Sequence, residues 1–151
     1  MAVWSRGRGL LGPLSPLIGD WISQPEAQQT QLPVRCTRVF RTFGRGWVAL
    51  NAVWEMGPRG DYREIALFGA TAGRGLGFFS FTNDGKRSEG RLADGSDIHP
   101  QALAFEAQMP VGLARMIHWP LGDEPGFSFA VESRSKAGWN RFLRLDYRPA
   151  T

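Results

Sequence analysis

The 151-residue sequence is short of cysteine, histidine and lysine, and each shortage excludes a class of protein. The single cysteine, Cys36, excludes an intrachain disulfide and a zinc site made of cysteines. The two histidines stand at unrelated positions without an acidic cluster beside them, so we predict no metal site. Basic residues outnumber acidic ones by 18 to 14 and nearly all are arginine, but they form no run. The charge therefore indicates neither a nucleic-acid nor a membrane partner, and we predict none.

Long apolar segments are also missing. No stretch approaches the roughly 20 apolar residues that a membrane-spanning helix needs. The N-terminal part, "MAVWSRGRGLLGPLSPLIGDW", has a short apolar stretch broken by two prolines, and it lacks a small-x-small cleavage site. We therefore expect no signal peptide, and together with the single cysteine this predicts a cytoplasmic protein.

Glycine and proline, by contrast, are plentiful and spread along the chain, with 19 and 10 residues. They gather with Asn and Asp in short groups such as "NDGK", where an Asp-Gly pair favours a tight hairpin. Between these groups lie the predicted strands: a first one after Gly19, then 34–43, 47–56, 62–68, 76–82, 87–92, 102–107, 111–119, 127–133 and 139–148. About ten short strands at even spacing indicate an all-β fold, a single antiparallel up-and-down β-barrel. We assign residues 10–151 to this barrel and residues 1–9 to a flexible tail.

Alternation of apolar and polar residues predicts which face of a strand points inward. In 127–133 the apolar residues Phe127 and Phe129 share one face. In the last strand, strict alternation puts Arg141 on the same face as Leu145, which is mainly apolar. If that face points inward, Arg141 becomes a buried cation that needs a partner.

The stretch Leu14–Ser23, "LSPLIGDWIS", predicts how one end of the barrel is closed. Its prolines forbid a long helix, so we expect one short helical turn that caps this end. Gly19 allows the chain to turn tightly into the first strand, and Trp21 supplies a large apolar plug with one N–H group. We expect Arg144 or Arg148 of the closing strand to stack on the indole ring.

Three stretches, "PLIGDW", "GRGWVALNAVWE" and "SRSKAGWNRFLRLDYR", resemble the calycin superfamily of lipocalin-like barrels. They look most like the nitrobindin-type barrels and a related bacterial family of uncharacterised function. The resemblance covers nearly the whole chain and implies a ten-stranded antiparallel barrel with an interior cavity. It also implies haem bound by a histidine of the last strand, which would fall at or near Arg141. The segment "WNRFLRLDYR" has no histidine, and arginine has no lone pair for iron.

We predict that Arg141 and Arg115 anchor an acidic group of an otherwise apolar ligand. The alternatives for Arg141 are an internal salt bridge, for example to Glu64, and a position at the rim. His118 is a candidate ligand contact or metal ligand, with a structural histidine as its alternative. Trp54 and Phe129 are candidates for the apolar lining, and Glu64 completes the six predicted ligand contacts.

The predicted function is non-catalytic binding of a small apolar or aromatic molecule inside the barrel, with no cofactor and no catalytic residue. One alternative is a haem protein that uses His118 in place of the missing last-strand histidine. The other is a cavity enzyme of the isomerase or hydrolase kind, with Glu64, His118 or Asp146 as its acid or base. Alternation places Asp146 on the outer face, which argues against it. A homodimer is left open.

Overall fold

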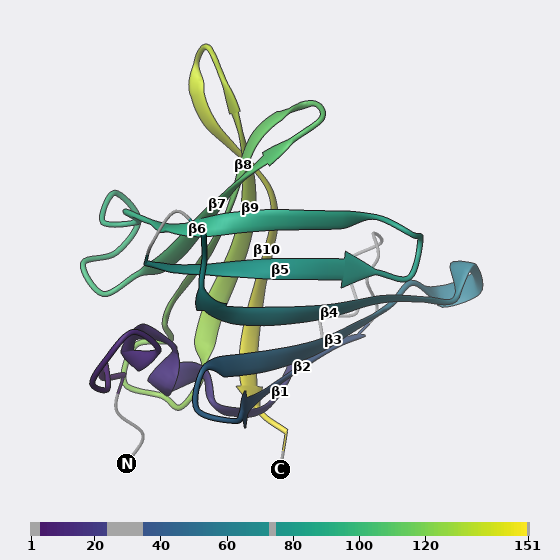
Figure 1. The fold of residues 1–151 in the computed structure, drawn as a ribbon. Helices are drawn as coiled ribbons and strands as arrows, with labels where there is room; N and C mark the ends of the chain where they lie inside the picture. The colour runs from purple at the N-terminus through teal and green to yellow at the C-terminus, as the bar shows by residue number, and fades with distance from the viewer. Residues whose placement is uncertain (1–3, 24–34, 73–74, 151) are drawn as a thin grey trace.

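The computed structural model describes residues 4–23, 35–72 and 75–150, and ten antiparallel strands among them form one closed β-barrel (Figure 1). Each strand pairs with its neighbours in the chain, and β1 also pairs with β10 to close the wall. The elements are η1 (Gly12–Leu17), β1 (Gly19–Ser23), β2 (Arg35–Phe43), β3 (Trp47–Glu55), η2 (Gly57–Arg59), β4 (Asp61–Ala70), β5 (Leu76–Thr82), β6 (Arg87–Ala93), β7 (Leu103–Met109), β8 (Gly112–Pro120), β9 (Phe127–Ser135) and β10 (Gly138–Pro149). The predicted fold class and strand number are confirmed.

Turn residues explain why the strands begin and end where the sequence predicts. In the turn between β5 and β6, Gly85 has a φ of 88°, a left-handed conformation that suits glycine. The Thr82 N–H donates to the Lys86 carbonyl at 2.9 Å across this turn. The Asp-Gly pair therefore makes the tight hairpin that "NDGK" predicts.

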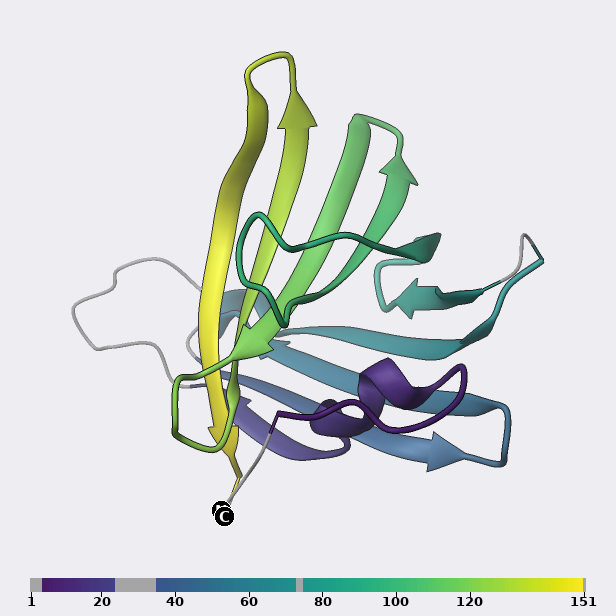
Figure 2. The ribbon, with the colours of Figure 1, turned by 90° about the vertical axis from the view of Figure 1, so that its left-hand side faces the viewer.

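The η1 turn closes one end of the barrel, as predicted (Figure 2). Leu14 and Leu17 of this turn are both 0% exposed and belong to the main core. Trp21 donates its indole N–H to the Leu17 carbonyl at 2.6 Å, and Gly19, with a φ of 142°, turns the chain between them. The expected arginine stacking on Trp21 is not found among the described residues: Arg144 lies over Trp119, Arg148 pairs with Glu124, and Trp21 makes a T-shaped contact with Phe127, at 5.2 Å between ring centroids.

At the opposite end the inward-facing side chains are half-buried. The rows that pair around the wall grade from fully buried near η1 to partly exposed away from it. The half-buried residues that face inward towards this end include the apolar or aromatic residues Trp54, Tyr62, Met116, Val131 and Leu143 and the polar residues Glu64, Thr82, Ser88 and Ser133. Among the described residues, the inward-facing side chains are therefore least covered at the end opposite η1.

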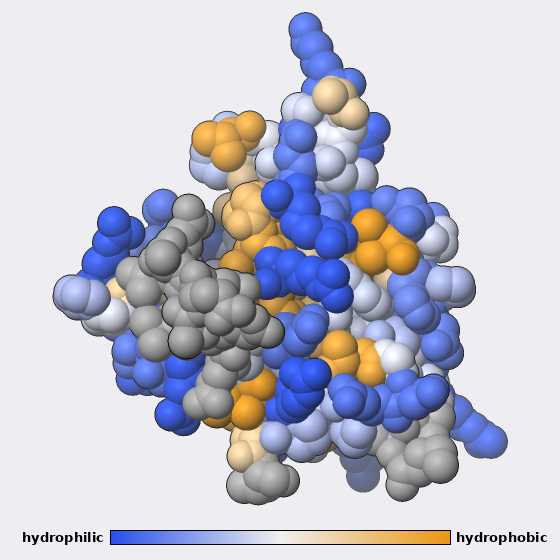
Figure 3. Space-filling model, turned by 180° about the vertical axis from the view of Figure 1, so that it is seen from behind, coloured by the Kyte–Doolittle hydropathy of each residue, from blue (hydrophilic) through white to orange (hydrophobic). Residues whose placement is uncertain are grey.

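A second, smaller core lies outside the barrel wall. The loop 94–101 between β6 and β7 folds over the outer face of β7–β9, where Ile98 packs on buried apolar residues. These residues are Ala102, Ala104, Ile117, Trp119 and Ala130. Figure 3 shows the back of the molecule, where hydrophilic residues form a band between apolar patches. Because this second core covers the outer face of β8 and the barrel core covers its inner face, both faces of the strand are covered along much of its length.

A β-bulge in β10 changes the orientation that alternation predicts for Arg141. Arg141 pairs with Glu132, but the next pair along the ladder is Leu143 with Val131, so Phe142 is the extra residue. The bulge shifts the parity of the strand, which is the usual effect of one unpaired residue. Arg141 therefore lies on the outer face, and the prediction that it shares a face with Leu145 is wrong.

Candidate functional site

Four of the six residues that we singled out lie inside the barrel: Trp54, Glu64, His118 and Phe129. His118 and Phe129 form a direct cross-strand pair and are 1% and 2% exposed. Trp54 and Glu64 belong to β3 and β4, on rows that face the same interior. The structure therefore places all four on the inner face of the wall, with His118 and Phe129 in direct contact.

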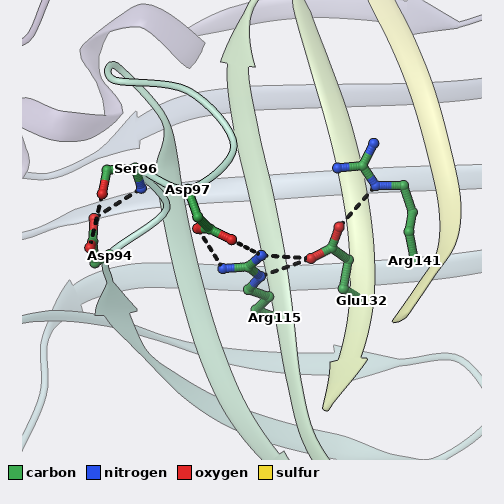
Figure 4. Close-up of polar contacts among 6 residues, drawn as sticks. All are labelled: Asp94, Ser96, Asp97, Arg115, Glu132 and Arg141. Carbon is green, nitrogen blue, oxygen red and sulfur yellow. Dashed lines mark hydrogen bonds and ion pairs between the residues drawn. The ribbon is translucent and has the colours of Figure 1, made fainter. Parts of the chain in front are cut away.

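Arg115 and Arg141 instead lie on the outer wall and share the carboxylate of Glu132 (Figure 4). The Nε of Arg115 donates to one oxygen of Glu132 at 2.9 Å, and the Nε of Arg141 donates to the other oxygen at 2.9 Å. Arg115 also donates to both oxygens of Asp97, at 3.0 and 2.7 Å, and these bonds lower the pKa of Asp97. The network fastens the loop 94–101 to the wall.

Two tryptophans of the outer wall pack against the guanidinium groups of these arginines. The guanidinium of Arg115 lies 4.3 Å from the ring centroid of Trp139, and that of Arg141 lies 5.3 Å from Trp119. Such contacts between a cation and a ring add stability beyond the ion pairs. Arg115 and Arg141 therefore already have carboxylate and aromatic partners, and neither faces the interior where a ligand would lie.

Arg38 of β2 is a cation inside the barrel that the sequence analysis did not single out. It lies on the same face of the strand as Cys36 and Phe40, which are both 0% exposed, and it is itself 3% exposed. Its Nε and Nη1 atoms have no hydrogen-bond partner in the described part of the chain. Its parity with Cys36 and Phe40 could have revealed it, because the other arginines of the strand alternate onto the outer face.

Aromatic rings are the contacts that the described residues offer the Arg38 guanidinium. Its central carbon lies 4.2 Å from the ring centroid of Phe129, 5.6 Å from that of Phe40 and 6.0 Å from that of Tyr147. A desolvated contact of this kind contributes about 2 kcal/mol. Removing an arginine from water costs several kcal/mol, so the rings offset only part of the penalty.

His118 and Tyr147 also carry open hydrogen-bonding capacity inside the barrel. The Nε2 atom of His118 and the hydroxyl of Tyr147 are buried without a partner among the described residues. Burial lowers the pKa of His118 well below its usual value, and the charge of Arg38 acts in the same direction, so the imidazole is neutral. Burial raises the pKa of Tyr147, which therefore keeps its proton.

These three side chains, from β2, β8 and β10, surround the ring of Phe129. The ring centroids of His118 and Tyr147 lie 4.9 and 6.3 Å from it, and Arg38 lies over it. We call Arg38, His118 and Tyr147 the Arg38 cluster. Because several buried polar groups without partners converge on one place, the cluster is the best candidate site in the molecule.

Cys36 lies beside this cluster but does not have the properties of a nucleophile. Burial raises the pKa of its thiol to about 11, so it stays protonated at neutral pH. A reactive cysteine needs the thiolate and a positioned base. Cys36 is therefore a small buried residue of the core.

Glu64 is the acidic group on the row of Arg38. Arg38 pairs with Ala52 in the ladder and Ala52 pairs with Glu64, so one alanine separates them across the inner wall. The Glu64 carboxylate accepts a hydrogen bond of 2.5 Å from the Ser80 hydroxyl. Among the described residues, no ion pair joins Glu64 to Arg38.

The interior does not fit haem bound through His118. The ring is 1% exposed, and its Nε2 atom is enclosed by protein. Phe40, Phe127 and Phe129 lie around it, with ring centroids 4.9 to 6.3 Å away. These rings occupy the space beside Nε2 that the broad macrocycle of haem, far larger than a single polar group, would need. Within residues 4–23, 35–72 and 75–150, no group of three His, Cys, Asp or Glu residues is placed to hold a metal.

A groove of about 480 Å³ lies on the outer wall at β6 and β7. Its polar lining includes Glu89, Arg91 and Glu106, and Arg91 and Glu106 are direct partners in the ladder. The groove contains none of the buried polar atoms that lack a partner. The barrel interior is therefore the stronger candidate.

Comparison of the chain with protein-family models gave no match, and comparison with curated proteins gave no similar sequence. The structure itself is a closed ten-stranded antiparallel barrel, an architecture compatible with a calycin-like barrel. In the described residues no helix has the length and apolar character needed to cross a membrane.

Proposed function

We propose that the protein binds a small apolar or aromatic molecule inside a barrel of the calycin type, without catalysis. One observation carries the proposal: η1 covers one end of the inner wall, and half-buried side chains, several of them apolar or aromatic, line the other end. A barrel of ten strands is wider than the small barrels whose interior side chains fill the space. Such an interior suits a ligand that enters through the half-buried end.

The lining determines the class of ligand. The half-buried rows present Trp54, Met116, Val131 and Leu143 to the entrance, and the buried row below them contains Phe129. Flexible methionine and flat aromatic side chains accept apolar bodies of different shapes. We therefore expect broad selectivity for the body of the ligand.

A cavity enzyme is the second candidate, favoured by the short bond between Glu64 and Ser80 on the inner wall. A carboxylate held in this way can act as a base towards a bound molecule. His118 is neutral and is not bonded to Glu64, so no acid–base pair supports it. Turnover of a candidate substrate that Glu64→Gln abolishes, in a variant that keeps the fold, would make this candidate the better one.

The proposed function predicts that filling the interior prevents binding. Val131 is half-buried on the inner wall and Val53 is half-buried on the outer wall, so the two valines form a matched pair. We expect Val131→Trp to weaken binding of the neutral fluorescent probe N-phenyl-1-naphthylamine at least about tenfold, since the indole occupies the ligand's space. Val53→Trp should bind the probe like the wild type.

Probe fluorescence measures the affinity, and circular dichroism checks that both variants fold. Native mass spectrometry of the wild-type protein tests for a molecule retained from its host. Equal loss of binding in both variants would place the probe outside the barrel. No binding by the wild type would contradict the proposed function.

A further inference from the structure

We propose that the ligand carries a carboxylate, and that Arg38 binds this group deep in the barrel. This inference rests on the proposed function and specifies the chemistry of its ligand. It follows from one cation that is 3% exposed and has two donor atoms without a partner. A carboxylate supplies the negative charge and the acceptor oxygens that those donors lack.

The charges inside the barrel favour a group with a single negative charge. Arg38 is the buried cation on the inner wall of the described residues, since Arg115 faces outward and is already paired. A group with two negative charges would leave one of them without a counter-charge, which low-dielectric surroundings penalise. A carboxylate balances Arg38 one to one.

The remaining members of the Arg38 cluster fit this ligand. Tyr147 keeps its hydroxyl proton and has no partner, so it can donate a second hydrogen bond to the carboxylate. His118 is neutral and adds no charge of its own. The rings of Phe129 and Phe40 flank Arg38 and exclude water from the ion pair.

The position of Arg38 sets the direction in which the ligand lies. Arg38 is one ladder row deeper than Cys36, which pairs with the half-buried Trp54. The carboxylate therefore lies towards η1, and the apolar body extends past Trp54 and Tyr62 to the half-buried end. The apolar lining and the buried cation thus serve different parts of one molecule.

The test compares ligands with the same chain and different head groups. Dodecanoate and methyl dodecanoate compete with N-phenyl-1-naphthylamine for the wild-type barrel. We expect dodecanoate to displace the probe at a concentration at least about tenfold lower, because one charge-assisted bond contributes at least that factor. Arg38→Met should bind both competitors equally, and Arg38→Lys, which keeps the charge, should retain part of the preference.

Arg141→Met is the control, since Arg141 is an arginine on the outer wall and 34% of its side chain is exposed. This variant should keep the full preference for dodecanoate. Thermal unfolding and circular dichroism establish that each variant folds, and the wild-type comparison needs no variant at all.

The outcomes separate this inference from the proposed function. Equal displacement by both competitors in the wild type would overturn the carboxylate while leaving interior binding intact. A preference that survives in Arg38→Met but disappears in Arg141→Met would move the anchor to the outer wall and overturn the inference. Failure of the neutral probe itself to bind would contradict the proposed function.

Discussion

Two buried arginines show how strongly the immediate surroundings of a residue determine its effect on stability. Arg38 is 3% exposed and Arg115 is 2% exposed, so both have left water to the same extent. Arg115 has Glu132 and Asp97 as partners, whereas Arg38 has aromatic rings and two donor atoms without a partner. The same amino acid is thus stabilising in one place and costly in the other.

This contrast predicts opposite effects of the same substitution. In the ligand-free protein, Arg115→Met should lower stability by about 3–5 kcal/mol, because it leaves the buried Glu132 with only Arg141. Arg38→Met should raise stability by about 1–4 kcal/mol, because it removes a buried cation that has two donor atoms without a hydrogen-bond partner. Thermal unfolding of both variants followed by circular dichroism measures the shifts. A lower melting temperature for Arg38→Met would show that the rings alone satisfy the guanidinium.

Part of the site can be predicted at the residue scale. Alternation identifies Phe129 as an inward residue and separates Arg38 from its neighbouring arginines. It does not reveal that Arg38 lacks a partner, because the partner of a buried charge comes from strands distant in the chain. The orientation of Arg141 fails for another reason: one unpaired residue, Phe142, reverses the parity of the strand, and no turn residue marks the bulge.

At the scale of single elements, the η1 turn decides whether one end of the barrel is closed. The η1 turn is only six residues long and contains two prolines, yet two of its leucines are completely buried. A short turn of this kind has little stability of its own. It persists because its apolar side chains fill the end of the barrel, so its contribution can be measured through them.

We therefore expect Leu17→Ala to lower the free energy of unfolding by about 2–5 kcal/mol, since it opens a cavity in the sealed end. Leu10→Ala is the matched control, because Leu10 is 44% exposed and its loss should change stability by less than about 0.5 kcal/mol. Urea unfolding of the two variants gives both values. Similar small effects would mean that η1 does not seal the core.

The loop 94–101 is the element that the sequence does not predict. Its polar letters, "DGSDIHPQ", are typical of a solvated turn. In the structure, Ile98 and Asp97 hold it against the outer wall, one by packing and the other by its bonds to Arg115. Such a role depends on the partners that the barrel brings underneath it, and these come from β7–β9.

For the whole molecule, the spacing of turns was sufficient to predict the architecture. About ten strands follow from the Gly, Pro, Asn and Asp groups, and pairing of each strand with its neighbour in the chain gives an antiparallel meander. The seam between β1 and β10, where Trp21 pairs with Pro149 and Ile22 with Arg148, completes the wall. The contents of the interior depend on side chains from all around the wall, so spacing cannot predict them.

The buried titratable groups predict a plateau in the stability of the whole fold with pH. The native protein holds His118 neutral, so below its usual pKa of 6.5 only the unfolded chain gains the proton, and stability falls as the pH falls. The raised pKa of Cys36, about 11 against a usual 9.0, has the opposite consequence: the unfolded chain loses its proton first, and stability falls as the pH rises above 9.

Urea unfolding between pH 5 and 11 tests this plateau. We expect His118→Gln to flatten the slope of stability between about pH 6.5 and 5, because the variant has no imidazole to protonate at that position. Cys36→Ala should likewise flatten the slope above about pH 9. Acid slopes that are identical in the wild type and His118→Gln would show that His118 titrates normally in the folded protein.

Under the proposed function, the closure of one end by η1 means that a ligand enters and leaves the barrel through the opposite end. A ligand that enters with its head group first must therefore leave with its tail first. The tail, which lies nearest the opening, would stay within reach of other molecules while the head group is held. Such a barrel would select its ligand by the chemistry of the head group and release it by the tail.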